Sequence, residues 1–170
     1  MKCIVTGGAG FIGSHLTDLL LSQGHQVKVL DNLCGGHLKN LQHLEKHPGF
    51  QFVQADIRNS EAIGQHFQGV DWVFHLAALA DIVPSIEKPR DYFETNVDGT
   101  FNVLEASKRE GVKRFLYAAS SSCYGLAKQF PTPETAPAEP QYPYALTKYL
   151  GEQLVLHWAQ VYKLPPLPIT

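Results

Sequence analysis

The stretch Val-Thr-Gly-Gly-Ala-Gly-Phe-Ile-Gly-Ser-His-Leu, residues 5–16, constrains the fold of this 170-residue chain more than any other. It follows the short apolar run 3–5. The apolar residues that come after the glycines recur with the spacing of one helix face: Ile12, Leu16, Leu19 and Leu20. A strand, a glycine-rich turn and a helix in this order are the setting of a dinucleotide-binding fingerprint.

Three glycines in this turn have separate geometric roles. Gly7 permits the tight turn out of the strand, and Gly10 lets the backbone approach a pyrophosphate. Gly13 allows the helix to pack closely on the strand. The start of the helix offers unpaired N–H groups and a partial positive charge to phosphates. Glycine turns are common, however, so the assignment needs a second feature.

Asp31 is that second feature. The segment 26–30 reads as the next strand, and it ends at Asp31, eighteen residues after Gly13. A carboxylate at about this separation accepts hydrogen bonds from the adenosine ribose hydroxyls. The alternative is a solvated aspartate in a turn before Asn32. Since a carboxylate disfavours a 2′-phosphate, the pattern favours NAD over NADP.

Alternating strands and helices predict the fold class. The expected strands lie at residues 3–5, 26–30, 50–54, 71–78 and 113–119. The expected helices include 92–109 and a helix from Tyr144 to about Tyr162, with a short helix at most in 38–47. The near-continuous apolar run 71–78 is typical of a strand covered on both faces. We therefore expect an α/β fold with a doubly wound (Rossmann) parallel sheet and helices on both faces.

Three polar residues on or near these strands have alternative interpretations. Asp56 follows the strand 50–54, so we assign it, with Ile57, to the adenine pocket. A helix N-cap role for Asp56 or Asn59 is the alternative. His75 lies within its strand and is interpreted as a hydrogen-bonded core histidine rather than a ligand.

Composition limits the function classes. Apolar residues make up 44% of the chain and charged residues 18%, as in an ordinary single globular domain. A net charge of −2 gives no electrostatic argument for nucleic acid or an anionic membrane. Cys3, Cys34 and Cys123 lack metal-ligand spacing, so we expect thiols and no metal. With no signal peptide before the first strand and no apolar run of about 20 residues, we expect a cytoplasmic protein.

Tyr144 and Lys148 are the candidate chemical pair. On a helix their spacing places them on one face, about 5–6 Å apart at Cβ. A neighbouring ammonium favours the phenolate, which makes tyrosine usable as a general base. The strand 113–119 is followed by three serines, Ser120–Ser122, which supply a hydroxyl that can orient a substrate oxygen. Such a pair alone is usually a solvated face, but here it follows a fingerprint, an aspartate and a serine-bearing strand end.

Taken together, these motifs resemble the extended short-chain dehydrogenase/reductase family, and within it the nucleotide-sugar epimerases and dehydratases. The resemblance covers residues 1–163. Its motifs are Thr6–Gly13, Asp31-Asn32, Asp56-Ile57, His75–Ala78, Asn96–Thr100, Ser120–Gly125 and Tyr144-xxx-Lys148.

The resemblance implies NAD as cofactor and a role for each matching residue. The implied NAD-binding residues are Gly7, Gly10, Phe11, Ile12, Gly13, Asp31, Asn32, Asp56, Ile57, Leu76, Ala77, Ala78, Asn96, Tyr144 and Lys148. Among them, Phe11 and Ile12 would hold the pyrophosphate and Lys148 the nicotinamide ribose. Ser120 matches the catalytic serine and Tyr144 the base.

The serine segment is similar to that of UDP-sugar 4-epimerases. The family's 4,6-dehydratases carry acidic residues where this chain has Ser121 and Ser122. The implied substrate is a UDP-hexose, a UDP-N-acetylhexosamine or a UDP-uronate. In the implied reaction Tyr144 removes the 4-hydroxyl proton while hydride passes from C4 to NAD⁺, and hydride then returns to the other face.

The end of the chain departs from the family pattern. Prolines at 165, 166 and 168 cannot donate to a sheet ladder, so we expect residues 164–170 to be a tail rather than the family's next strand. The chain then resembles a truncated member without its substrate domain. Phe115–Ala119 would be an open apolar edge, favouring self-association or a homodimer. A non-catalytic dinucleotide-binding module, or an inactive truncated fragment, is the alternative function.

The ribose assignment is testable by substitution. Asp31→Ala is expected to weaken NAD binding by about 1–3 kcal/mol, because a charged hydrogen-bond acceptor is lost. Calorimetric titration measures this, and an unchanged affinity would remove Asp31 from the site.

Overall fold

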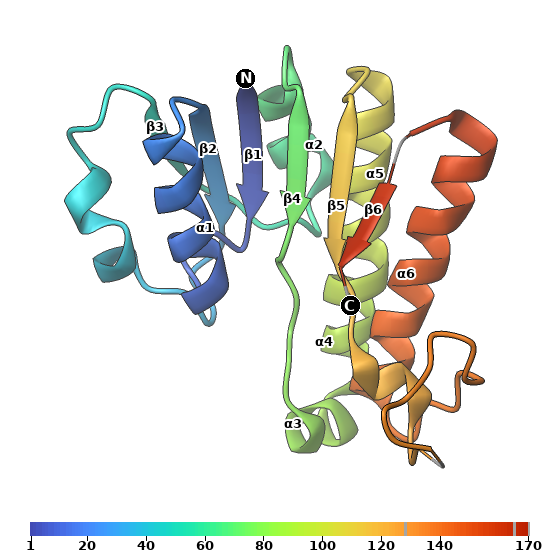
Figure 1. Cartoon of the computed structure of the whole chain (residues 1–170). Helices are drawn as coiled ribbons and strands as arrows, with labels where there is room; N and C mark the ends of the chain where they lie inside the picture. Colours follow the sequence, from blue (N-terminus) through green and yellow to red (C-terminus); the bar gives the residue numbers. More distant parts are fainter. Residues whose placement is uncertain (128, 165, 170) are drawn as a thin grey trace.

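A six-stranded parallel sheet forms the centre of the computed structural model, which describes residues 1–127, 129–164 and, for the backbone, 166–169. The strands are β1 (Lys2–Thr6), β2 (Gln26–Asp31), β3 (Phe50–Gln54), β4 (Trp72–His75), β5 (Arg114–Ala118) and β6 (Pro166–Ile169). They lie in the order β3-β2-β1-β4-β5-β6 (Figure 1). Because the order reverses between β1 and β4, the ligand crevice of such a sheet is expected at the carboxyl ends of these two strands.

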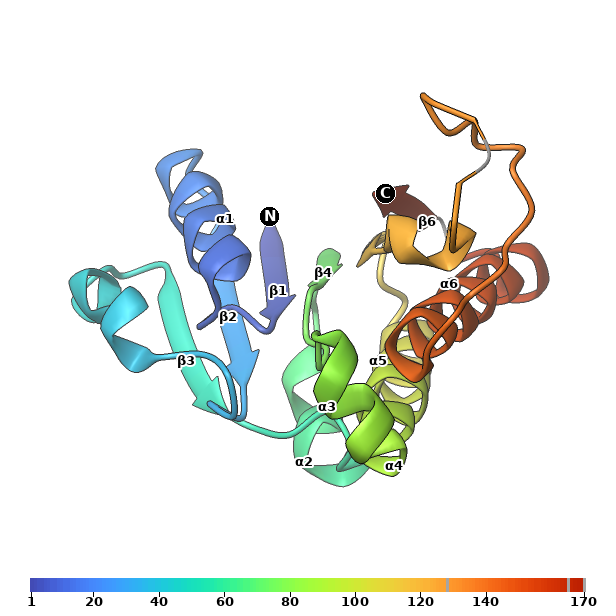
Figure 2. The ribbon, with the colours of Figure 1, turned by 90° about the horizontal axis from the view of Figure 1, so that it is seen from below.

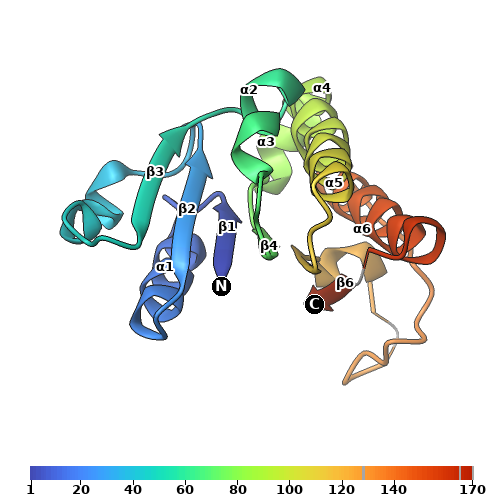
Figure 3. The same ribbon diagram turned by 90° about the horizontal axis from the view of Figure 1, so that it is seen from above.

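Helices cover both faces of the sheet. They are α1 (Phe11–Ser22), α2 (Ser60–Gly64), α3 (Ile82–Glu87), α4 (Pro89–Phe93), α5 (Gly99–Arg109) and α6 (Pro143–Tyr162). The view along the sheet in Figure 2 shows α1 on one side and α2, α5 and α6 on the other, and Figure 3 shows the same two layers from the opposite end. The predicted doubly wound parallel sheet is therefore confirmed.

Two apolar cores follow from the alternation of side chains along each strand. On β1, Cys3 and Val5 point into the core under α1, which also holds Leu20 and Val29. Ile4 points into the opposite core, which is the larger and is completed by side chains of α2, α5 and α6. Both faces of β1 are therefore buried, as its continuous apolar sequence indicates.

The helix predicted over 92–109 is present but interrupted. Residues Glu94–Asp98 form a single π-helical turn between α4 and α5. Such turns are rare and often lie at functional sites, and this one carries Asn96. The segment 38–47 contains two short 3₁₀ turns, Leu38–Asn40 and Gln42–Leu44, in agreement with the expectation of a short helix at most.

The expectation of a non-strand tail is wrong. Residues Pro166–Ile169 form β6, which pairs in parallel with Phe115–Ala118 of β5. Pro166 and Pro168 alternate with Leu167 and Ile169, so the nitrogens that lack a hydrogen lie on one side of the strand. An edge strand needs donors on its inner side only, and proline is tolerated there. The predicted open edge at Phe115–Ala119 is thus covered, while Pro165 and Thr170 lie outside the described residues.

The described helices include none that combines the length and apolarity needed to cross a bilayer.

Lys163 provides a test of the C-terminal end of α6. It adopts the left-handed conformation, with φ 57°. This conformation costs a residue with a Cβ about 1–2 kcal/mol, partly offset by the greater chain entropy that glycine loses on folding. Lys163→Gly is therefore expected to raise the free energy of unfolding by about 0.5–1 kcal/mol in urea titrations. Gln160→Gly, inside the helix, is expected to lower it by about 1 kcal/mol; equal effects of the two glycines would contradict the assignment.

Candidate functional site

The turn between β1 and α1 brings the backbone of both elements into direct contact. Gly7 has a φ of +69°, and a Cβ there would lie 2.7 Å from the backbone nitrogen of Ala77. A Cβ on Gly13 would collide with the carbonyl oxygen of Gly7. The N-cap of α1 is Gly10, without a side-chain cap. The first N–H groups of α1 are thus free of a side-chain cap, as an anion-binding helix start requires.

A cleft of about 420 Å³ opens at the carboxyl ends of the central strands. Eight of the predicted cofactor residues line it: Gly7, Gly10, Asp31, Asn32, Ile57, Leu76, Ala77 and Ala78. The other predicted site residues are not among its lining residues: Phe11, Ile12, Gly13, Asp56, Asn96, Ser120, Tyr144 and Lys148. Phe11 and Ile12 expose 79% and 67% of their surface, so any part in pyrophosphate binding falls to their backbone amides.

Asp31 is fixed at the inner wall of the cleft. Its carboxylate accepts hydrogen bonds from the backbone N–H of Ala9 at 3.0 Å and of Leu33 at 2.8 Å. The residue is buried, with 8% of its surface exposed. Two backbone donors occupy part of the acceptor capacity of a carboxylate, which has about four lone-pair sites. The remaining capacity faces a cleft, as a ribose-binding role requires.

Asp56 lies beside the cleft in an ion pair. Its carboxylate accepts hydrogen bonds from the Arg58 guanidinium, the shortest at 2.7 Å, and from Asn32 Nδ2 at 3.0 Å. The hydrogen bonds from Arg58 lower the pKa of Asp56 to about 2. The N-cap of α2 is instead Asn59, whose side chain accepts from Ala62 N–H. Asp56 therefore positions Asn32 in the cleft wall, and only Ile57 of the predicted adenine pair lines the cleft.

Asn96 connects the cleft to α6. Its side-chain oxygen accepts from Leu79 N–H at 2.8 Å, and its Nδ2 donates to Leu79 O at 2.9 Å and Thr147 Oγ1 at 3.1 Å. All of the polar atoms of this buried amide side chain thus have hydrogen-bond partners. Because Thr147 precedes Lys148 directly, one side chain sets the position of the strand-end loop and of the α6 pair.

His75 is a core residue, as predicted. Thr100 Oγ1 donates to the Asn96 carbonyl, so His75 Nε2 is the donor in its 2.9 Å contact with Thr100. Nδ1 is then the acceptor from Thr6 Oγ1, at 2.7 Å. Burial, and next the charge of Lys148, lower the pKa of His75 to about 3. The imidazole is therefore neutral, and both of its nitrogens are engaged.

Lys148 is buried close to the chemical site. It exposes 5% of its surface, and its Nζ lies 4.2 Å from the centre of the Tyr117 ring. Burial lowers the pKa of Lys148 to about 8, against the opposing charge of Glu152. Tyr117 donates its hydroxyl proton to Lys148 O at 3.2 Å. The surroundings of a lysine in this environment therefore determine how much of it is protonated near neutral pH.

Ser120 and Tyr144 are presented by neighbouring elements. Ser120 caps the 3₁₀ turn Ser121–Tyr124, and its Oγ lies 2.7 Å from Ser122 Oγ. Tyr144 lies in the first turn of α6, with its ring stacked on Tyr142 at 6.4 Å and edge-on to Tyr92 at 6.4 Å. The 3₁₀ turn packs against α6, so the turn that Ser120 caps and the helix that carries Tyr144 are neighbours.

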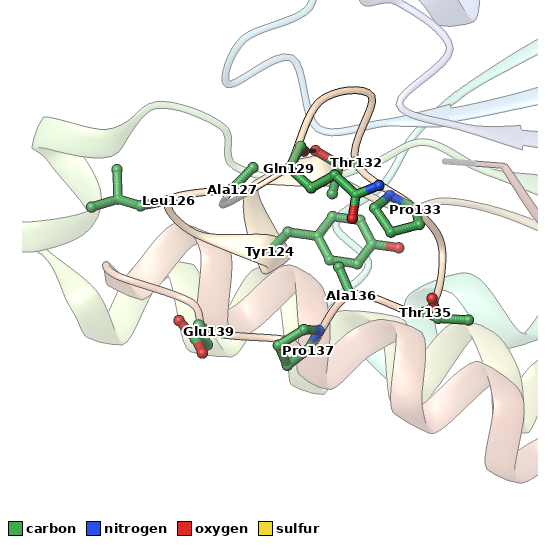
Figure 4. Close-up of a pocket in the computed structure, with 10 residues that line it drawn as sticks. All are labelled: Tyr124, Leu126, Ala127, Gln129, Thr132, Pro133, Thr135, Ala136, Pro137 and Glu139. Atoms are coloured by element: carbon green, nitrogen blue, oxygen red, sulfur yellow. Dashed lines mark hydrogen bonds between the residues drawn. The ribbon is translucent and has the colours of Figure 1, made fainter.

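The Pro-rich loop 126–142, which precedes α6, has no helix or strand in its described residues. It encloses a separate pocket of about 280 Å³. Figure 4 shows the Tyr124 ring extending into this space beside Gln129 and Ala136. Glu139 N–H donates to Cys123 O at 2.9 Å, which fixes the loop beside Ser120.

Tyr92 and Asp81 are two of the residues that line the cleft and that the sequence motifs do not predict. Tyr92 is buried, lines the cleft and donates its hydroxyl to Ala80 O at 2.6 Å. Asp81 also lines the cleft and has an unusual φ of 92°. No sequence pattern distinguishes Tyr92 from an ordinary apolar helix position. The backbone conformation of Asp81 depends on contacts outside its own segment.

The residues present fit a dinucleotide. A cleft of about 420 Å³ lies beside an uncapped helix start, and a Cβ at Gly7 or Gly13 would obstruct the turn between them. The buried Asp31 carboxylate lies at the carboxyl end of β2, the strand next to β1. Among the described residues, no three His, Cys, Asp or Glu side chains are grouped so that they could hold a metal ion.

Known proteins with similar sequences and folds include nucleotide-sugar epimerases and dehydratases. The UDP-glucose 4-epimerase of Lacticaseibacillus casei is 38% identical over 163 residues, which are 95% of this chain and 47% of that protein. The UDP-glucose 4-epimerase of Thermotoga maritima, solved with UDP-glucose, matches with a TM-score of 0.92 and 37% identity, over 99% of this chain and 54% of that one. A double mutant of the dTDP-glucose 4,6-dehydratase DesIV of Streptomyces venezuelae, solved with NAD, matches with a TM-score of 0.94 and 33% identity, over 99% of this chain and 54% of that one.

The chain spans about half the length of these relatives. The model of the NAD dependent epimerase/dehydratase family matches residues 3–169, nearly the whole chain. The chain belongs to the NAD-dependent epimerase/dehydratase family.

Proposed function

We propose that this chain is the cofactor-binding and catalytic part of an NAD-dependent UDP-sugar 4-epimerase. The observation that carries the proposal is the burial of Lys148 one helical turn after Tyr144, whose ring contacts Tyr92 in the wall of a cleft with the features of a dinucleotide site. A buried lysine without functional use is a stability cost, and functional sites are where such costs persist.

Each member of the chemical group has a role in the proposed reaction. NAD, when bound, supplies the hydride acceptor for the sugar carbon. Tyr144 removes the proton of the sugar hydroxyl and returns it to the oxygen of the inverted product. Lys148 stabilises the phenolate through its positive charge. Ser120 holds the same oxygen by a hydrogen bond, with its hydroxyl oriented by Ser122 at 2.7 Å.

The segment after Ser120 supports epimerisation rather than dehydration. Elimination of water requires an additional acid and base. Ser121 is exposed, and Ser122 is engaged with Ser120. Neither side chain is an acid or base of the required strength. A UDP-hexose is the proposed substrate, with a UDP-N-acetylhexosamine or UDP-uronate as variants of the same reaction.

A second copy of the chain is the proposed partner. A groove of about 540 Å³ runs between α4 and α6 and is lined by Phe93, Val97, Leu150, Gln153, Leu154, Leu156, His157 and Gln160. No Asp, Glu, Lys or Arg is among these residues. An uncharged apolar face can pair with its own copy without like-charge repulsion, which supports a homodimer.

A cytoplasmic location is also part of the proposal. The three cysteines are free thiols, the state that reducing compartments maintain.

The role of Tyr144 is tested in a version extended by the second half that the longer relatives carry. Tyr144→Phe is expected to reduce UDP-glucose epimerisation by about 10²–10⁴-fold, because the proton-transfer group is lost. Its NAD affinity in calorimetric titration should be unchanged. Tyr142→Phe, the stacked neighbour, serves as the matched control and should keep the parent rate. A Tyr144→Phe rate within about threefold of the parent would exclude tyrosine as the base. NAD binding without turnover in the extended parent would support the non-catalytic module instead.

Replacement of Lys148 is expected to raise the stability of the protein and to lower its affinity for NAD. Burial depresses the pKa of Lys148 from 10.5 to about 8, so charging it opposes folding fully below pH 8. Lys148→Met is therefore expected to raise the free energy of unfolding by about 1–3 kcal/mol at pH 7. The gain should shrink as pH rises from about 8 toward 10.5, since the folded parent no longer holds the proton.

The measurement is urea unfolding at pH 7 and pH 10, with NAD affinity determined in parallel. NAD binding of Lys148→Met should fall even though the protein is more stable. Lys88→Met replaces an exposed lysine and should change neither quantity. A loss of stability at pH 7 in Lys148→Met would show that its charge is compensated in the folded state.

A further inference from the structure

A second polar pocket lies at the opposite end of the sheet from the cleft. It has a volume of about 290 Å³ and is formed where β1, β2 and β3 begin, at the end of the sheet marked by the N-terminus in Figure 1. Its polar lining residues are Lys2, Gln26, Lys28, Gln51 and Gln68. None of them has a role in the proposed reaction.

Strand pairing brings three of these side chains to one face. Lys28 pairs directly with Gln51 of β3, and Lys2 of β1 pairs with Gln26, two residues before Lys28. Side chains alternate along a strand, so Lys2, Lys28 and Gln51 share the face that carries Ile4. The sheet register therefore gathers two lysines and an amide from three strands that are well separated in sequence.

The turn before β4 closes the pocket and orients the lysines. Lys28 Nζ donates to the carbonyl oxygen of His66 at 3.1 Å. Lys2 Nζ lies 3.8 Å from the position that a Cβ on Gly69 would occupy. The Lys28 ammonium is thus held by the His66 carbonyl, and the Lys2 ammonium lies close to the turn at Gly69.

The pocket carries positive charge without a matching carboxylate. None of its described lining residues is Asp or Glu. Asp71, at the same end of the sheet, accepts hydrogen bonds from Lys113 Nζ at 2.6 Å and from the Lys2 backbone N–H at 2.9 Å. Burial and the charge of Lys2 lower the pKa of Lys28. Burial and the charge of Lys28 lower the pKa of His66. The fold therefore holds like charges together, and an anion would relieve their repulsion.

We propose that this pocket binds a phosphate group, either as inorganic phosphate or as the phosphate of a small sugar monophosphate. A phosphate dianion matches two ammonium groups, which bind it as point charges. The amides of Gln51 and Gln68 can donate to its remaining oxygens. The site is at the end of the sheet where the strands begin, so it is independent of the cofactor cleft and of the proposed reaction.

The test is a titration of the ¹⁵N-labelled chain followed by amide chemical shifts. Potassium phosphate and glucose 6-phosphate are compared with potassium chloride at equal ionic strength. Saturable shifts at the amides of residues 26–28, 51 and 68–69 are expected with phosphate and absent with chloride. Shifts by inorganic phosphate alone would identify the free ion as the ligand; tighter binding of glucose 6-phosphate would identify the ester.

Matched variants connect the shifts to the lysines. Lys28→Gln is expected to weaken phosphate binding at least tenfold, whereas Lys39→Gln, on the exposed turn Leu38–Asn40, should leave it unchanged. If Lys28→Gln does not fold, the exposed Lys2→Gln gives the same comparison. Shifts confined to residues 11–13, no saturation, or equal binding by the lysine variants would each overturn the proposal.

Discussion

The close approach of α1 to β1 is the constraint on which the rest of the structure depends. At Gly13, any side chain would occupy the space of the Gly7 carbonyl, and at Gly7 it would meet the backbone of Ala77. Three segments therefore meet without intervening side chains. This contact aims the start of α1 at the cleft and places the strand end of β4 beside it. Gly7 and Ala77, which meet at this contact, both line the cleft.

A buried polar network extends this arrangement to the chemical residues. His75 joins β1 to α5 through Thr6 and Thr100, and Asn96 joins the strand-end loop to Thr147 of α6. Every buried side-chain nitrogen and oxygen among the described residues has a hydrogen-bond partner. A partner lost from such a network leaves a buried group unsatisfied, at a cost of about 1–3 kcal/mol. Hydrogen bonding thus fixes the distance between the cofactor loop and α6.

Lys148 and the pocket at Lys28 share a physical property. Both hold a positive charge where burial disfavours it. The charge of Lys148 lies one helical turn from Tyr144, and the charge of Lys28 lies on the same sheet face as that of Lys2. Such arrangements oppose folding, and apolar packing elsewhere compensates for them. The larger core, which includes Phe67, Leu104 and Phe115, supplies burial of the kind that stabilises a domain.

Local patterns in the sequence were sufficient for much of the fold and for part of the site. The glycine turn, the Asp31 strand end and the Tyr144–Lys148 spacing depend on short segments, because turns and helices are set by neighbouring residues. The tertiary structure alone decided the pairing of β6 despite its prolines, since edge position determines which donors are needed. It also decided the partners of Asn96 and the burial of Lys148. The placement of Lys2 and Lys28 on the same face of the sheet likewise follows from strand register, which relates residues distant in sequence.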